Sequence, residues 1–574
     1  MHEFSVWAPA ASQVELRLAG ADVAMEQEPG GWWRREIEEA GGGTRYGFSL
    51  DAGAPRPDPR SGFQPDGVDG LSELVDHDSF AWSDGGWRGV SLRGAVLYEL
   101  HVGTFTPEGT FEAVSTRLAH LVELGVDAIE LMPVVEFAGE RGWGYDGVDL
   151  FAPHHAYGGP VGLKRLVDAC HAAGIGVVID VVYNHLGPAG NYLAEFGPYF
   201  SQRHQTSWGA AVNFDGPGSE EVRRFVVENA LMWLRDYHAD GLRLDAVHAI
   251  VDESARHVLE ELADEVDALA TSLGRPLFLI AESDLNDPRF VRSRDAGGYG
   301  LDAAWADEWH HALHAALTGE RSGYYEDFGS LTLLGKALRQ AWVYDGTWSS
   351  HRQRRHGRSP AGIPGYRFVV CTQNHDQVGN RALGERSSAL MSEGRLRIAA
   401  ALLLAAPFTP MLFQGEEWGA TAPFPYFTDH DPELGQAVSE GRRGEFAAFG
   451  WDADELPDPQ AATTFEASKL AWDELDRPAH AGLFRWHCEL LALRRRTPAL
   501  SDPRLSRVGV EVDEATRTLA VTRGPVKVLV NLGAGDHRFG LRGETTILAA
   551  SAPAVRLTGQ TITVPADAVV IIET

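Results

Sequence analysis

Short apolar runs alternate with amphipathic segments through the middle of the chain, from about residue 94 to residue 496. Each run is apolar at nearly every position, which is typical of a strand buried on both faces of a parallel sheet. The segments between the runs repeat apolar residues at helical spacing, for example over residues 111–124, 162–173 and 395–405. The predicted strands are 95–101, 128–132, 176–181, 241–245, 277–282, 301–305, 368–372 and 410–413. Eight strands with interleaved helices predict an α/β fold of the (β/α)8 TIM-barrel type.

The two ends of the chain have a different pattern. In residues 1–90 and 499–574, short runs alternate apolar and polar residues and are separated by Gly and Pro, which is typical of antiparallel sheets. We therefore expect an N-terminal β-sandwich (1–90), a barrel domain (91–498) and a C-terminal antiparallel β-sandwich (499–574). The connection after the third barrel strand, about 184–217, is much longer than usual and rich in aromatic residues and Gly. We expect it to form a small excursion beside the cleft.

Composition limits the partners of the chain. Its formal net charge of −31 disfavours binding to nucleic acid or to an anionic membrane, because both need basic surface. No apolar run is long enough to span a membrane, and the opening MHEFSVWAPA does not have the regions of a signal peptide. Cys170, Cys371 and Cys488 are far apart in the sequence, which argues against a disulfide framework or a zinc site. We expect a cytoplasmic protein.

Polar side chains appear at the carboxyl ends of four predicted strands. The segments are GVVIDVVYNH (176–185), GLRLDA (241–246), PLFLIAES (276–283) and RFVVCTQNHD (367–376). Their polar residues include Asp180, Asn184, His185, Arg243, Asp245, Glu282, Asn374, His375 and Asp376. Barrel enzymes place their catalytic groups at this end of the strands. One Arg/Asp pair could equally be a structural ion pair, but four such strand ends predict a catalytic site.

In their order and spacing, DVVYNH, GLRLDA, the Glu of AES and NHD resemble the four motifs of the α-amylase superfamily, glycoside hydrolase family 13. Longer stretches resemble one group within it, the malto-oligosyltrehalose trehalohydrolases. These stretches include ERGWGYDGVDLFAPHHAYGG, VVYNHLGPAGNYL, NHDQVGNRALGER and FQGEEWGATAPFPYFTDH. Near the N-terminus, WAPAASQVEL resembles the carbohydrate-binding-module-like β-sandwich that precedes the barrel in branching, debranching and trehalohydrolase enzymes. The resemblance covers nearly the whole chain.

The resemblance implies retaining glycoside hydrolysis. This reaction needs one carboxyl group to protonate the leaving oxygen and a second to attack the sugar from the opposite face, the two being about 5–5.5 Å apart. The motifs match Asp245 to the nucleophile, Glu282 to the acid/base, and Asp376 to a carboxylate that holds sugar hydroxyls and favours ring distortion. A further carboxylate near Glu282 should raise its pKa and keep it protonated.

Four more positions are candidates for substrate binding. Arg243 stands two residues before Asp245, so both side chains project from one face of the strand, and Arg243 should keep Asp245 ionised and oriented. By resemblance, His185 and His375 hydrogen-bond the sugar in the cleaved subsite, and Tyr145 in GWGYDG stacks on that sugar. Each of these residues could instead be a satisfied strand-end side chain without a substrate contact.

DEWHHALH (307–314) follows the sixth predicted strand. By resemblance, we expect Asp307 and His310 to line the leaving-group side of the cleft, where trehalose would bind. His310 and His314 have the helical spacing of a zinc pair, but no HExxH glutamate or third ligand accompanies them. Asn184 often lies near a structural calcium in the superfamily. The sequence offers no convincing set of six to eight oxygen ligands, so we expect no metal.

The reaction implied by the resemblance is hydrolysis of the α-1,4 bond next to the terminal trehalose of a malto-oligosyltrehalose, without a cofactor. A malto-oligosyltrehalose synthase would then act upstream as a functional partner. The nearest alternative is a glycogen branching or debranching enzyme, which has the same three carboxylates, but the flanks HLGPAGNYL and PFPYFTDH favour the trehalohydrolase. A remote alternative is a non-catalytic glucan-binding barrel. Such proteins lose one or more of the carboxylates, and all three are present here.

Overall fold

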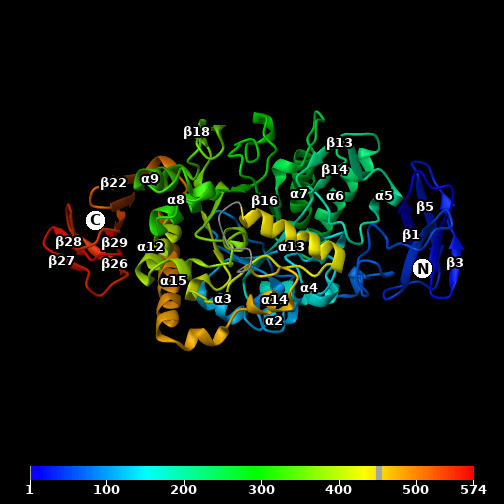
Figure 1. Cartoon of the computed structure of the whole chain (residues 1–574), viewed down its shortest axis with the longest axis horizontal. Coiled ribbons are helices and arrows are strands. Elements are labelled where there is room, and N and C mark those ends of the chain that lie inside the picture. Colours follow the sequence, from blue (N-terminus) through cyan, green and yellow to red (C-terminus); the bar gives the residue numbers. More distant parts are fainter. Residues whose placement is uncertain (1, 448–455) are drawn as a thin grey trace.

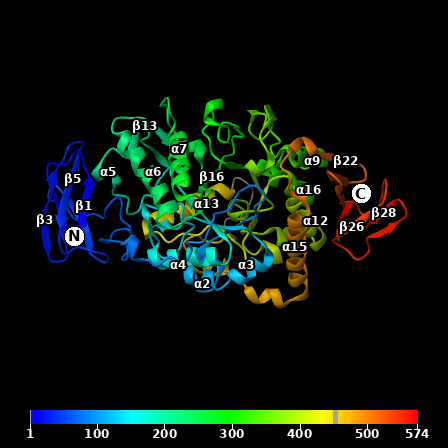
Figure 2. The same cartoon turned by 180° about the vertical axis from the view of Figure 1, so that it is seen from behind.

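Eight parallel strands close into a barrel in the middle of the molecule, and antiparallel sheets lie at its two ends (Figure 1). The structure is a computed structural model that describes residues 2–447 and 456–574. Seen from behind, the N-terminal and C-terminal sheets again lie at opposite ends of an elongated molecule (Figure 2). The barrel therefore lies between the N-terminal and the C-terminal sheets along the long axis of the molecule.

The barrel strands agree with the predicted ones, with ends that differ by at most two residues. They are β8 (Leu97–Leu100), β9 (Ala128–Leu131), β12 (Gly176–Val181), β15 (Gly241–Leu244), β16 (Phe278–Ala281), β17 (Ala303–Trp305), β20 (Phe368–Cys371) and β21 (Thr409–Phe413). Each strand pairs in parallel with the next, and β21 pairs with β8 to close the barrel. Every position of these strands is buried, as continuously apolar runs predict. The (β/α)8 fold class is confirmed.

Helices follow the barrel strands, as the helical spacing predicts. The main ones are α4 (Gly159–Ala172), α6 (Ser219–Arg235), α7 (Val258–Leu273), α8 (Asp307–Thr318), α9 (Leu331–Gln340), α12 (Glu393–Leu404) and α15 (Pro478–Arg496). The helix predicted over 111–124 is instead two, α2 (Phe111–Ser115) and α3 (Leu118–Leu124). At the break, the Thr116 hydroxyl donates to the Ala113 carbonyl at 2.6 Å. This local bond competes with the helical hydrogen-bond pattern.

The flanking sheets are antiparallel, as predicted. At the N-terminus one sheet contains β1 (His2–Trp7), β5 (Trp32–Ile37) and β4 (Glu26–Gln27), and the other contains β3 (Ala21–Ala24), β2 (Val14–Leu18), β6 (Arg45–Leu50) and β7 (Ser72–Glu73). At the C-terminus the larger sheet contains β22 (Val508–Asp513), β23 (Thr518–Arg523), β24 (Val526–Asn531), β29 (Ala568–Glu573) and β26 (Thr546–Ala550). The smaller one contains β25 (His537–Gly540), β28 (Thr561–Val564) and β27 (Arg556–Thr558). The exact domain boundaries stay a prediction.

Two buried arginines bind backbone carbonyls at and beyond the end of α12, and one of them, Arg523, joins the C-terminal sheet to the barrel. Arg523 in β23 donates to the carbonyl of Ala405 at 2.6 Å, just beyond the end of α12. Arg494 in α15 donates to the carbonyl of Leu404 at 2.9 Å. The last carbonyls of a helix have no partner within the helix, so these guanidinium groups satisfy them, Arg494 from α15 and Arg523 from the C-terminal sheet.

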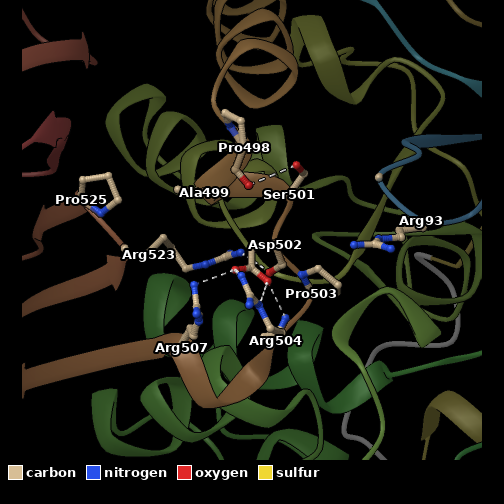
Figure 3. Close-up of a pocket in the computed structure, with 12 residues that line it drawn as sticks. Arg93, Pro498, Ala499, Ser501, Asp502, Pro503, Arg504, Arg507, Arg523 and Pro525 are labelled. Atoms are coloured by element: carbon tan, nitrogen blue, oxygen red, sulfur yellow. Dashed lines mark hydrogen bonds and ion pairs between the residues drawn. The ribbon is translucent and has the colours of Figure 1, made fainter.

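A cavity of about 700 Å³ lies at the same joint. Figure 3 shows Arg504, Arg507 and Arg523 beside Asp502 in this cavity, with Arg93 on its opposite side. Asp502 accepts a hydrogen bond from Arg504 at 2.6 Å. Arg93 and Gly94, which line this cavity, come just before β8. The cavity therefore lies at the amino-terminal end of the barrel strands, opposite to their carboxyl ends.

Among the helices in the described part of the chain, none is both long and apolar enough to cross a bilayer.

Candidate active site

A cleft of about 950 Å³ opens at the carboxyl ends of the barrel strands. Its walls come from loops that follow the strands, from the tip between β13 (Phe200–Thr206) and β14 (Gly209–Val212), and from α13 (Pro432–Ala447). The hairpin lies within the long connection that the sequence predicted to be an excursion beside the cleft. Six of the nine predicted site residues line the cleft: Tyr145, His185, Asp245, Glu282, His375 and Asp376.

Asp245 and Glu282 each stand one residue beyond a barrel strand. The backbone N–H of Asp245 donates to the Val181 carbonyl at 3.0 Å, and that of Glu282 donates to the Leu244 carbonyl at 2.9 Å. The parallel hydrogen-bond pattern therefore continues through both residues and fixes their backbone. Each of the two side chains is 13% exposed. Both carboxyl groups are thus held at the floor of the cleft with little access to bulk water.

Arg243 lies fully buried beneath these carboxylates. Its Nη1 donates to Oδ1 of Asp245 at 2.8 Å and to Oδ2 of Asp180 at 2.8 Å. Its Nη2 lies 3.8 Å from Oε2 of Glu282. The guanidinium also stacks over the ring of Trp305, 4.3 Å from the centroid. One cation therefore holds the carboxylates of Asp180 and Asp245 by hydrogen bonds and lies near the carboxyl group of Glu282. The two-residue spacing of Arg243 and Asp245 does place both side chains on one face.

Asn184 holds the other carboxylate oxygen of Asp245. Its Nδ2 donates to Oδ2 of Asp245 at 2.8 Å and to the backbone carbonyl of Asp245 at 2.9 Å. The side-chain oxygen of Asn184 in turn contacts Nδ1 of His185. Sequence reasoning considered Asn184 as a strand-end residue that supports the site and as a possible calcium neighbour, but did not predict its contact with Asp245. The available signal was that Asn184 follows β12 and Asp245 follows β15, two neighbouring parallel strands whose carboxyl ends lie side by side.

Glu282 has the electrostatics of a general acid. Burial is the first cause that raises its pKa well above the ordinary range, and the charges of Asp245, Asp307 and Asp376 raise it further, while Arg243 partly offsets them. The direction agrees with the prediction, but burial raises the pKa more than any single neighbouring carboxylate does. Oε2 accepts a hydrogen bond from the backbone N–H of Ala246 at 2.6 Å.

Ala246 reaches Glu282 through an uncommon backbone conformation. Its φ is +38°, in the left-handed region that residues with a Cβ rarely adopt. This turn directs the N–H that follows Asp245 towards the neighbouring strand end. Such strain is often found at functional sites, where the surrounding structure maintains it.

His375 lies in a second buried network beside Asp245. The hydroxyl of Tyr145 lies 2.8 Å from its Nε2 and donates to Oδ2 of Asp180 at 2.7 Å. The rings of Tyr145 and His375 stack with centroids 5.1 Å apart. On the other side, Glu99 accepts a hydrogen bond from Nδ1 of His375 at 2.6 Å. Sequence reasoning missed Glu99, although an acidic residue within the apolar run of the first barrel strand was a signal.

Trp208 is a second residue that sequence reasoning did not single out. It stands at the tip between β13 and β14, lines the cleft and is 51% exposed. Its ring stacks on that of His185, with centroids 5.3 Å apart and planes 17° apart. Burial lowers the pKa of His185, which favours the neutral ring. A half-exposed tryptophan above a cleft-lining histidine offers a flat apolar face to a sugar ring.

Asp307 and His310 lie behind the cleft wall at the start of α8. Burial, followed by the charges of Asp376 and Asp284, raises the pKa of Asp307 to about 7. His310 is 2% exposed and its ring nitrogens contact the Thr372 carbonyl at 2.6 Å and the Tyr325 hydroxyl at 2.8 Å. Within the described part of the chain, neither residue is among those that line the cleft.

Among the residues that the structure describes, two groups of side chains have the spacing of metal ligands, and both already have internal partners. In the group of Glu136, His154 and His155, Nδ1 of His154 accepts a hydrogen bond from the Ala156 N–H at 3.1 Å. Neutral His154 then carries its proton on Nε2, the atom that faces the group, so this atom is no ligand. In the second group, His204, Asp215 and Glu253, the glutamate pairs with Arg203 at 2.6 Å. Neither group requires a metal to explain its contacts.

The comparisons with known proteins agree with this geometry. The family model for the alpha-amylase catalytic domain matches residues 75–208. A malto-oligosyltrehalose trehalohydrolase from Arthrobacter ramosus is 55% identical over 538 residues, which cover 93% of each chain. One from Rhizobium sp. (strain M-11) is 49% identical over 573 residues, covering 98% of this chain and 96% of that one. A crystal structure of a putative alpha amylase from Salmonella typhimurium is 38% identical, with a TM-score of 0.91, and covers 100% of this chain and 97% of that one. The chain belongs to the malto-oligosyltrehalose trehalohydrolase family of glycosidases.

Proposed function

We propose that this chain hydrolyses the α-1,4 bond next to the terminal trehalose of malto-oligosyltrehaloses, releasing trehalose and a maltooligosaccharide. The observation that carries the reaction type is the pair Asp245 and Glu282, fixed around Arg243 at the floor of the cleft. The environment keeps Glu282 protonated, while Asp245 accepts hydrogen bonds from Arg243 and Asn184. One carboxyl group is therefore ready to give a proton and the other to attack, as a retaining glycosidase requires.

The reaction proceeds by double displacement. Oδ of Asp245 attacks the anomeric carbon as Glu282 gives its proton to the glycosidic oxygen, so that trehalose leaves and a glycosyl-enzyme ester forms. Glu282, now ionised, takes a proton from a water molecule, and the oxygen of that water attacks the anomeric carbon and releases Asp245. Asp376, 42% exposed in the cleft, holds the hydroxyls of the reacting sugar and favours its distortion.

The remaining predicted residues bind the two sides of the substrate. Tyr145, His185 and His375 line the subsite of the sugar that forms the ester. Asp307 supports the leaving-group side from behind the wall of the cleft through its charge near Glu282 and Asp376. His310 acts on the same side through the Thr372 carbonyl that it holds.

The substrate has to be made by an enzyme that rearranges the reducing end of a maltooligosaccharide into a trehalose unit. We expect functional coupling to such a malto-oligosyltrehalose synthase. Cys170, Cys371 and Cys488 are free thiols, which supports a reducing compartment such as the cytoplasm.

The deciding experiment is a parallel digestion of maltotriosyltrehalose and maltopentaose, with the products separated by chromatography. Trehalose and maltotriose from the first substrate, with maltopentaose nearly untouched, are the expected result. Equal cleavage of both substrates would instead mean a general α-1,4 hydrolase. Longer or branched products would mean a transferase, which is the alternative that the relatives at 49% and 55% identity disfavour.

A further inference from the structure

Glu99 and His375 form a buried pair, and the proposed reaction has used only the histidine. Glu99 lies in β8, and His375 begins α10 (His375–Gly379), 276 residues later. One carboxylate oxygen accepts from Nδ1 of His375 at 2.6 Å and the other from its backbone N–H at 3.0 Å. Each side chain is only 1% exposed. A carboxylate bound twice to one histidine fixes both the position of the residue and the orientation of its ring.

The hydrogen bonds also determine how many protons the ring carries. Burial raises the pKa of Asp180 to about 6 against the charge of Arg243, so above that pH Asp180 is ionised beside Arg243, with contacts of 2.8 and 2.9 Å. It accepts the single hydroxyl proton of Tyr145 at 2.7 Å. The Tyr145 oxygen, 2.8 Å from Nε2 of His375, therefore has only lone pairs left for that contact. Nε2 must donate, and Nδ1 already donates to Glu99. His375 consequently carries a proton on both nitrogens.

We propose that Glu99 is a positioning residue that holds His375 as a buried imidazolium beside the sugar that is transferred to Asp245. The proposal rests on the proposed function, because the sugar subsite does. A cation at this place, 3.5 Å from Oδ2 of Asp376, balances the carboxylates around the sugar, and its Nε2–H donates to the Tyr145 hydroxyl at the wall of the subsite. Without Glu99, the ring loses both its anchor and the charge that keeps its second proton.

The surroundings of His375 support this assignment. Burial alone would lower the pKa of His375, and the charge of Arg243 acts in the same direction. The charges of Asp376 and Glu99 and the hydrogen bond to Glu99 outweigh both and raise the pKa to about 9. The titratable groups that face the ring or interact with it electrostatically are Glu99, His101, Glu130, Tyr145, Asp180, Arg243, Asp307 and Asp376.

Glu130 provides a matched control. It pairs with Glu99 in the register of β8 and β9 and is 1% exposed. Among the described residues, neither of its carboxylate oxygens has a hydrogen-bond partner. Burial and then the charge of Glu99 raise the pKa of Glu130 well above its ordinary range, so the group is neutral. Glu130→Gln makes the same chemical change as Glu99→Gln, but it removes neither a charge nor a bond to His375.

The test compares kcat and KM for maltotriosyltrehalose between pH 5 and 10 in wild type, Glu99→Gln and Glu130→Gln. We expect Glu99→Gln to move the alkaline limb of kcat/KM down by about one pH unit or more, the usual effect of losing an opposite charge at this distance. We expect its kcat to fall at least ~10-fold at pH 8, where the ring of the variant has lost its second proton. Glu130→Gln should keep the wild-type profile. An unchanged limb in Glu99→Gln, or the same shift in both variants, would overturn the proposal.

A measurement on the unliganded wild-type enzyme is independent of substrate and of how well the variants fold. The ¹³Cε1 resonance of His375, assigned by its absence from His375→Asn, should titrate near pH 9 rather than near the ordinary value of 6.5. Titration at or below 6.5 would refute the imidazolium assignment. If wild type released no trehalose while this resonance still titrated near 9, the proposed function would fail and the role of Glu99 towards His375 would stand.

Discussion

Replacing Arg243 by Met tests the assignment of this residue as the cation that organises the cleft floor. The substitution keeps most of the side-chain volume and removes the charge. It leaves Asp180, 2% exposed, and Asp245, 13% exposed, without their shared partner. Removing one partner of a buried ion pair costs about 3–5 kcal/mol, because the remaining charge has no compensation.

The expected change in thermal stability follows from the size of the barrel. The unfolding entropy is about 2.1 cal/mol/K per residue, and roughly 400 residues lie between the start of β8 and the end of α15. A loss of 3–5 kcal/mol then lowers the melting temperature by about 4–6 °C. Activity should fall at least ~100-fold, because Asp245 keeps only Asn184 to orient it.

The double variant Arg243→Met/Asp180→Asn separates charge burial from catalysis. Removing the unpaired charge of Asp180 should recover part of the lost stability without restoring activity. Calorimetry at one fixed scan rate gives the melting temperatures, and single-turnover hydrolysis of maltotriosyltrehalose gives the rates. A melting temperature within 1 °C of wild type for Arg243→Met would refute the reasoning. So would a double variant no more stable than the single one.

Four further outcomes are expected. The pKa of His375 is about 9 in the folded protein against an ordinary 6.5, so protonation of this ring stabilises the folded state fully below pH 6.5 and ceases to do so as the pH rises through 9. The free energy of unfolding measured in urea should therefore be about 3 kcal/mol larger at pH 6.5 than above pH 9. Glu282→Gln should lower kcat on maltotriosyltrehalose by about 10²–10⁴-fold, yet retain glycosyl-enzyme formation from a glycosyl fluoride, whose leaving group needs no proton. Trp208→Ala should raise KM about fivefold, by about 1 kcal/mol of lost stacking, with kcat nearly unchanged. Arg523→Met should lower the melting temperature with normal kcat, because backbone carbonyls at the C-terminal joint lose their donor at a cost of about 1–3 kcal/mol; equal loss of kcat would contradict a purely structural role.

The periodicity of the sequence was sufficient to predict the barrel and its strand ends. A strand buried on both faces has to be apolar throughout, so a local apolar run identifies it without knowledge of its neighbours. Asp245 and Glu282 could be placed at one face for the same reason, because parallel strands in a barrel end at a common face. The break at Thr116 could not be seen in this way, because it depends on a side-chain bond rather than on the apolar pattern.

The chemistry of the residues around these carboxylates depended on contacts between distant parts of the chain. Glu99 meets His375 across 276 positions, and Trp208 reaches His185 only because the β13–β14 hairpin folds back over the cleft. Sequence periodicity reports which face of a single element is buried. Hydrogen-bond partners, depth of burial and the charge state of Glu282 are set by several elements packed together, so only the tertiary structure decided them.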